Sequence, residues 1–143
     1  MLNYAEARNE YLTTPDASVY KVLQDIRKRV NIPAGNVVGY AYGLKSSGMT
    51  KDEMRIAIRN ERRIEMAFEE QRFWDLRRWK LAETELNKNL NGMIITRNAT
   101  TGALTYQKSV VGKISFANPR MYFYPIPYNE ITKNTNLVQN TGW

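Results

Sequence analysis

The chain has 143 residues, of which 43% are hydrophobic and 24% charged, proportions typical of an ordinary globular domain. It contains no cysteine and no histidine, so disulfide bonds, zinc sites built from those residues and histidine-based catalysis are excluded, and we expect no metal and no cofactor. The net charge of +7 is spread along the chain without a basic block, so we expect no nucleic-acid partner.

Residues 1–32 are predicted to form a pair of helices. The first covers residues 2–12. The second covers roughly residues 15–30, because Thr14 followed by Pro15 is typical of a helix start. Apolar residues follow at helical spacing: Val19, Val22, Leu23, Ile26 and Val30. The basic triplet at residues 27–29 ends this helix, where cations complement the helix dipole.

Residues 33–49 are predicted to form a loop. They contain Pro33 and four glycines, and a loop of this length in a compact domain is often functional. Asn36, Tyr40 and Tyr42 lie in it. The loop is therefore the first place to look for ligand-binding side chains.

Residues 50–85 are predicted to form one long helix, which begins with a capping box of Thr50 and Glu53. Its core-facing stripe carries four charged residues that need partners in an apolar interior: Glu61, Glu65, Arg72 and Asp75. We interpret them as a structural ion network. The alternative, a general acid and base of a glycosidase formed by the first two acids, requires carboxylates on two sides of a sugar, whereas residues four apart stand side by side on one helix surface.

Residues 86–143 are predicted to be rich in loops. Met93–Thr96 and Ala103–Lys108 form a candidate hairpin, Arg120–Pro127 ends in an extended conformation before its prolines, and Tyr128–Lys133 is predicted to form one helical turn. Tyr122, Phe123 and Tyr124 in this stretch are interpreted as core residues. The fold class expected for the chain is therefore mostly α with a minor β segment, as a single domain over residues 1–143.

The segment Arg59–Trp79, RNERRIEMAFEEQRFWDLRRW, resembles the signature of the SusD/RagB family of outer-membrane nutrient-binding lipoproteins. Two more stretches, in the right order, are similar to segments of that family: YAEARNE at residues 4–10, and YPIP at residues 124–127 with the closing residues 136–143. One departure is Glu70-Gln71, which stands where the family often has Gly-His; we expect the long helix to be locally different here but better helix-forming.

The resemblance implies a predominantly α-helical protein with tetratricopeptide-like helix pairs, here one pair plus the long helix. It implies no enzymatic activity and no catalytic residue. It further implies capture of an oligosaccharide or other nutrient on the cell-surface side of the outer membrane of Bacteroidota, for uptake through a TonB-dependent transporter of the SusC type. This chain would be a C-terminal fragment that supplies mainly scaffold, with membrane attachment only through a lipid anchor in the missing N-terminal part.

For a sugar ligand, the candidate binding residues are Tyr40, Tyr42 and Asn36, because tyrosine rings stack on pyranose faces and an amide can hydrogen-bond to hydroxyl groups. The alternative for these residues is packing of the loop onto the body. Two other functions remain open: a helical protein-interaction scaffold without a small ligand of its own, and the glycosidase described above.

Overall fold

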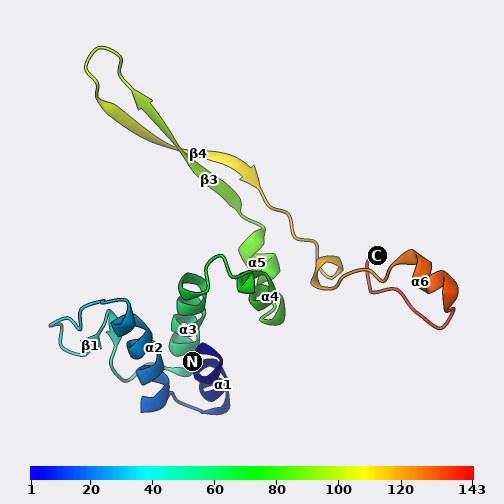
Figure 1. Ribbon diagram of the computed structural model, residues 1–143, viewed down its shortest axis with the longest axis horizontal. Helices are drawn as coiled ribbons and strands as arrows, with labels where there is room; N and C mark the ends of the chain where they lie inside the picture. Colours follow the sequence, from blue (N-terminus) through cyan, green and yellow to red (C-terminus); the bar gives the residue numbers. More distant parts are fainter. The chain divides into compact units, whose positions relative to one another are not determined.

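The computed structural model describes all residues from Met1 to Trp143, and they divide into two compact units, residues 1–72 and residues 73–143. Figure 1 shows helices in the first unit and a long β-hairpin in the second. The expected mostly helical fold with a minor β component is confirmed. The expected single-domain organisation stays a prediction, and each unit is described by itself.

The first unit is built on three helices, α1 (Leu2–Tyr11), α2 (Ala17–Arg29) and α3 (Lys51–Glu65), with α1 packed against both of the others. Helix α2 starts later than the sequence predicts, because its cap is Asp16 and not Thr14: the carboxylate accepts hydrogen bonds from two backbone N–H groups, those of Ser18 and Val19. The capping box of α3, formed by Thr50 and Glu53, is confirmed.

The core of the first unit lies between these three helices. The inward-facing apolar residues of α2 are buried. They contact apolar residues of the first two turns of α3 and one residue of the loop, Leu44. The buried apolar side chains are Leu2, Ala5, Val19, Tyr20, Leu23, Ile26, Leu44, Met54 and Ile58. Burial of Leu44 matters for function, because it fixes the loop to the helices.

Where the sequence predicts one helix over residues 50–85, the structure has three: α3, α4 (Gln71–Arg78) and α5 (Ala82–Leu86). The chain leaves the helical conformation at Phe68, Glu70 and Lys80, which have φ angles of 65°, 59° and 57°. These are left-handed conformations that a right-handed helix cannot contain. The local difference expected at Glu70-Gln71 is present, whereas the expectation of better helix formation is wrong at Glu70, and Gln71 begins α4.

The second unit combines α4 from Phe73 onward, α5, a long hairpin and a C-terminal segment. Its small core contains Leu76, Ala82 and Phe116. The predicted hairpin is confirmed and longer than expected, with β3 (Asn89–Arg97) paired to antiparallel β4 (Leu104–Lys113). A short 3-10 helix η1 (Arg120–Tyr122) precedes an extended Phe123, and the predicted helical turn is α6 (Tyr128–Lys133).

Candidate functional site

The glycine-rich loop of the first unit folds into a small hairpin. Strand β1 (Tyr40–Ala41) pairs antiparallel with β2 (Leu44–Lys45), and only Tyr42 and Gly43 connect them. Both connecting residues have positive φ angles, 54° and 70°, as the two-residue turn most compatible with strand twist requires. Gly43 adopts this conformation without strain, whereas Tyr42 is a residue that rarely does so.

Three contacts hold this hairpin in place on the first unit. The Leu44 side chain lies in the core, the Tyr42 N–H donates to the carbonyl of Ala34 at 2.9 Å, and the Tyr42 carbonyl accepts from Nη1 of Arg27 at 3.0 Å. An ion pair of 3.1 Å between Lys45 and Glu53 adds a surface contact to α3. The loop therefore has a defined conformation, which a binding site needs.

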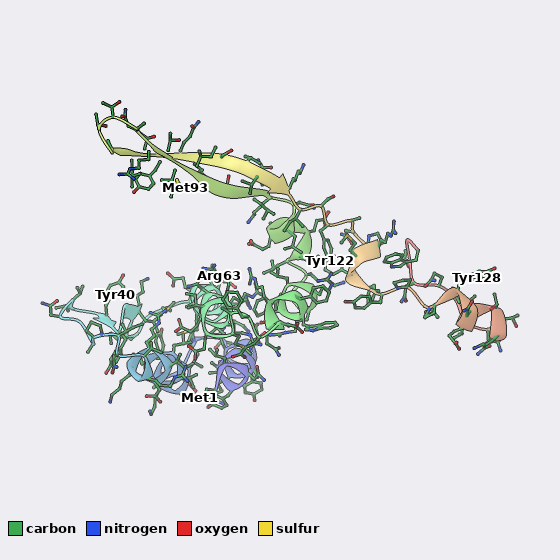
Figure 2. The ribbon with its side chains drawn as sticks, turned by 45° about the horizontal axis from the view of Figure 1, so that its top comes forward. Met1, Tyr40, Arg63, Met93, Tyr122 and Tyr128 are labelled. Carbon is green, nitrogen blue, oxygen red and sulfur yellow. The ribbon has the colours of Figure 1, made fainter.

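Tyr40 lines a pocket of about 370 Å³ together with Ala34, Gly35, Val37 and Gly43. Tyr40 as a residue is 48% exposed (Figure 2 labels it), and a Cβ on Gly35 would meet no other atom within 4 Å. The pocket is thus open to solvent and is lined by small or apolar residues beside an accessible tyrosine. An apolar wall with one aromatic ring suits the apolar face of a sugar ring better than it suits a charged group.

The other two predicted ligand residues are placed differently. Tyr42 is half-buried and does not line this pocket; its backbone forms the turn that follows Tyr40. Asn36 is exposed in the same loop and does not line the pocket either. Of the three, only Tyr40 belongs to the wall of the cavity.

The charged residues on α3 pair with α2. Nε and Nη2 of Arg27 donate to Oε2 of Glu61 at 3.0 and 2.8 Å, with side chains only 15% and 8% exposed. Glu65 of α3 pairs with Arg29, which lies on α2 like Arg27. Arg27 thus contacts both Glu61 and the backbone carbonyl of Tyr42 in the loop. The sequence did not predict this connection, because the carbonyl belongs to a residue distant from Arg27 along the chain.

The remaining two residues of the expected network lie on α4. Asp75 is buried and accepts hydrogen bonds from Nε and Nη2 of Arg78, one turn later, at 2.9 and 2.8 Å. Arg72 is half-buried at the start of the same helix. Glu61, Glu65 and Asp75 therefore each have an arginine partner, two of them in α2 and one in α4 itself.

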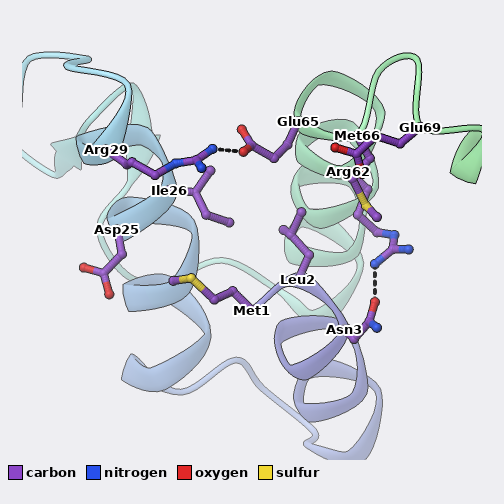
Figure 3. Close-up of a pocket in the computed structure, with 10 residues that line it drawn as sticks. All are labelled: Met1, Leu2, Asn3, Asp25, Ile26, Arg29, Arg62, Glu65, Met66 and Glu69. Carbon is purple, nitrogen blue, oxygen red and sulfur yellow. Dashed lines mark hydrogen bonds and ion pairs between the residues drawn. The ribbon is translucent and has the colours of Figure 1, made fainter.

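A second cavity of the first unit, of about 350 Å³, is lined by both apolar and charged residues (Figure 3). The Arg29 and Glu65 pair lies in its wall, and Arg62 donates to Oδ1 of Asn3 at 2.6 Å. Glu61 does not line it, because its carboxylate is buried against Arg27. Glu61 and Glu65 thus do not present two carboxylates to one cavity, the arrangement that a glycosidase uses.

The second unit has an aromatic pocket of about 180 Å³ that the sequence did not predict, lined by Phe73, Arg77, Met121, Phe123, Tyr124 and Trp143. The guanidinium carbon of Arg77 lies 3.4 Å from the centre of the Phe73 ring. Phe123 and Tyr124 are exposed, so their interpretation as core residues is wrong, whereas Tyr122 packs edge-on against Phe116. The sequence signal for this pocket was the density of aromatic residues on either side of the hairpin.

No group of three or more carboxylates is placed to hold a metal ion. Separately, none of the helices combines the length and apolar character needed to cross a bilayer.

Comparison with known proteins gives one family. The whole chain, residues 1–143, matches the family model described as the SusD family. The chain is 27% identical over 140 residues to the SusD-like protein P2 of Formosa agariphila, an alignment that covers 98% of this chain and 23% of that protein. The chain therefore spans about a quarter of the length of this curated relative. No solved structure matches it significantly.

Proposed function

The chain belongs to the SusD family, and we propose that it serves the binding of a glycan or other nutrient at the cell surface rather than catalysis. The observation that carries the proposal is the exposed ring of Tyr40 in an apolar, glycine-lined pocket on a loop held by contacts to α2 and the core. A saccharide ring stacks on such a surface, and the pocket volume of about 370 Å³ is within the range of small-ligand sites.

The proposed setting is the outer face of the outer membrane, with a SusC-type TonB-dependent transporter as partner. Family membership supports this setting. In it, the chain contributes mainly scaffold, since its buried Arg27 and Glu61 pair connects two helices and the loop. A lipid anchor carried by another part of a longer protein would provide the membrane attachment.

A second candidate function is that of a helical scaffold that binds only protein. The observation that favours it is the exposure of two neighbouring aromatic side chains on α4, Phe73 and Trp74, whose ring centres lie 4.9 Å apart. Such side chains are expected at surfaces that pack against another protein. In this case the Tyr40 pocket would bind no sugar.

Calorimetry and affinity electrophoresis of the 143-residue chain against a panel of soluble polysaccharides test the proposal. We expect binding to at least one polysaccharide, weakened about tenfold or more by Tyr40→Ala, which removes one stacked ring. The matched control is Tyr11→Ala, an exposed tyrosine at the end of α1 that lines no described pocket. Absence of binding to the whole panel, or equal loss in both variants, would contradict a sugar site at Tyr40.

A further inference from the structure

Within the second unit, the β3–β4 hairpin is a two-stranded ribbon whose strands contact chiefly each other (Figure 1). All its residues are exposed or half-exposed. An isolated two-stranded hairpin is at best marginally stable in water, because neither face buries apolar surface. A ribbon of this length is therefore expected to rest against something.

The two faces of the outer half of the hairpin differ. On one face, the register brings together four large apolar side chains that are each 49–63% exposed: Met93, Ile95, Leu104 and Tyr106. On the opposite face of this half, Ile94 is paired with Gln107 and is followed by the Thr96 and Thr105 pair, whereas towards the base of the hairpin the Val111 side chain packs over Gly92. The face of the hairpin that carries the first set is called the apolar face below.

The charge of the hairpin is of one sign. From Asn89 to Lys113 the chain carries Arg97, Lys108 and Lys113 and no acidic residue. Arg97 and Lys108 belong to the apolar face, paired with Leu104 and Met93. Long basic side chains can cover apolar surface with their stems while the charged ends reach an anionic layer.

We propose that the apolar face docks on an anionic lipid surface, with the hairpin lying flat among the headgroups. The combination of aliphatic side chains, one tyrosine and basic groups without acids is complementary to a negatively charged interface. At headgroup level the outer edges of both strands stay hydrated, so their unpaired backbone groups need no partner strand. The proposal is independent of nutrient binding at Tyr40.

Two other occupants fit less well. A second copy of the chain, packed face to face, would bring the Arg97 and Lys108 side chains of both copies into one interface without any carboxylate to neutralise them. A protein partner normally recognises a tryptophan, tyrosine or arginine set in a packed pocket. On the apolar face, Tyr106 and Arg97 are exposed among aliphatic side chains and line no described pocket.

The experiment is co-sedimentation of the full 143-residue chain with vesicles. One preparation contains phosphatidylcholine alone, and the other contains equal parts of phosphatidylcholine and phosphatidylglycerol. We expect binding to the anionic vesicles only, weakened at high salt because exposed charges are screened. Replacing both Arg97 and Lys108 by glutamine is expected to weaken binding roughly five-fold per charge removed.

The matched pair of variants is Ile95→Glu and Ile94→Glu, neighbours in β3 that lie on opposite faces with similar exposure. We expect Ile95→Glu to abolish vesicle binding and Ile94→Glu to retain most of it, with circular dichroism spectra of both matching the parent chain. Failure to bind anionic vesicles, or equal loss in the two variants, would overturn the proposal. So would a concentration-dependent dimer in light scattering that only Ile95→Glu dissociates.

Discussion

Arg27 binds Glu61 and the backbone carbonyl of Tyr42 at the same time, with donor–acceptor distances of 2.8–3.0 Å. The buried ion pair between α2 and α3 is thereby connected to the turn that follows Tyr40. One guanidinium group thus contributes both to the packing of the helices and to the conformation of the candidate site. Through Arg27 of α2, the charged residue Glu61 of α3 therefore has a role in positioning the loop.

Arg27→Met is expected to destabilise the first unit by about 3–5 kcal/mol, because it leaves the Glu61 carboxylate buried without its partner. Urea unfolding followed by circular dichroism measures the loss. The double variant Arg27→Met with Glu61→Met should recover most of it, since no buried charge then remains. A single variant as stable as the parent chain would show that the pair is not desolvated.

Arg27→Lys separates the two roles of this residue. A lysine keeps the positive charge but has no planar fork, so it cannot reach Glu61 and the Tyr42 carbonyl together in the same geometry. We expect a smaller loss of stability than in Arg27→Met and, where the chain binds a polysaccharide, weaker binding as the Tyr40 loop loses an anchor. Unchanged polysaccharide affinity in this variant would mean that the other contacts, Leu44 in the core and the Lys45 and Glu53 pair, position the loop without Arg27.

The fold could be predicted from the sequence wherever a local pattern determined it. The capping box at Thr50 and the apolar spacing of α2 located two helices, and the turn-rich residues 98–102 located the long hairpin. The interruptions after Glu65 and Arg78 were missed, because residues such as Phe68 and Lys80 carry no glycine or proline signal and adopt positive φ angles only in the context of the folded chain.

The candidate site was predictable to the same extent. Glycine content and length identified the loop, and an aromatic ring in a loop identified Tyr40. The separate roles of Tyr42 and Asn36 could not be distinguished, since residues two to four apart in an irregular segment have no periodicity that gives their orientation. The contact of Arg77 with Phe73 follows ordinary helical spacing, but the pocket that they line was missed, because its other residues lie far along the chain, at 121–143.

Glu70→Gly is expected to stabilise the first unit relative to Glu70→Ala by about 1 kcal/mol. Glu70 has a φ angle of 59°, a conformation that costs a residue with a Cβ roughly 1–2 kcal/mol and glycine very little. The greater freedom of glycine in the unfolded chain offsets part of this gain. Thermal unfolding of the two variants measures the difference, and a more stable alanine variant would indicate that the residue is helical.

The cap of α2 predicts how stability depends on pH. Hydrogen bonds from Ser18, then those from Arg8, lower the pKa of Asp16 from 3.8 to about 2. A carboxylate whose pKa is lower in the folded chain stabilises the fold above the pKa of the unfolded chain, and this contribution is lost as the pH falls from about 4 towards 2. We expect the free energy of unfolding to decline over that interval.

Asp16→Asn is the matched test, because asparagine caps a helix as well as aspartate does but does not titrate. Urea unfolding at pH 2, 3, 4 and 7 should show a shallower decline in this variant than in the parent chain, with less stability at pH 7 where the charged contact to Arg8 is missing. Asp16→Ala lacks the cap as well and should be the least stable of the three at pH 7. An identical pH dependence in the parent and asparagine chains would assign the acid sensitivity to other carboxylates, such as Glu10, whose pKa is lowered by its hydrogen bonds from Arg55.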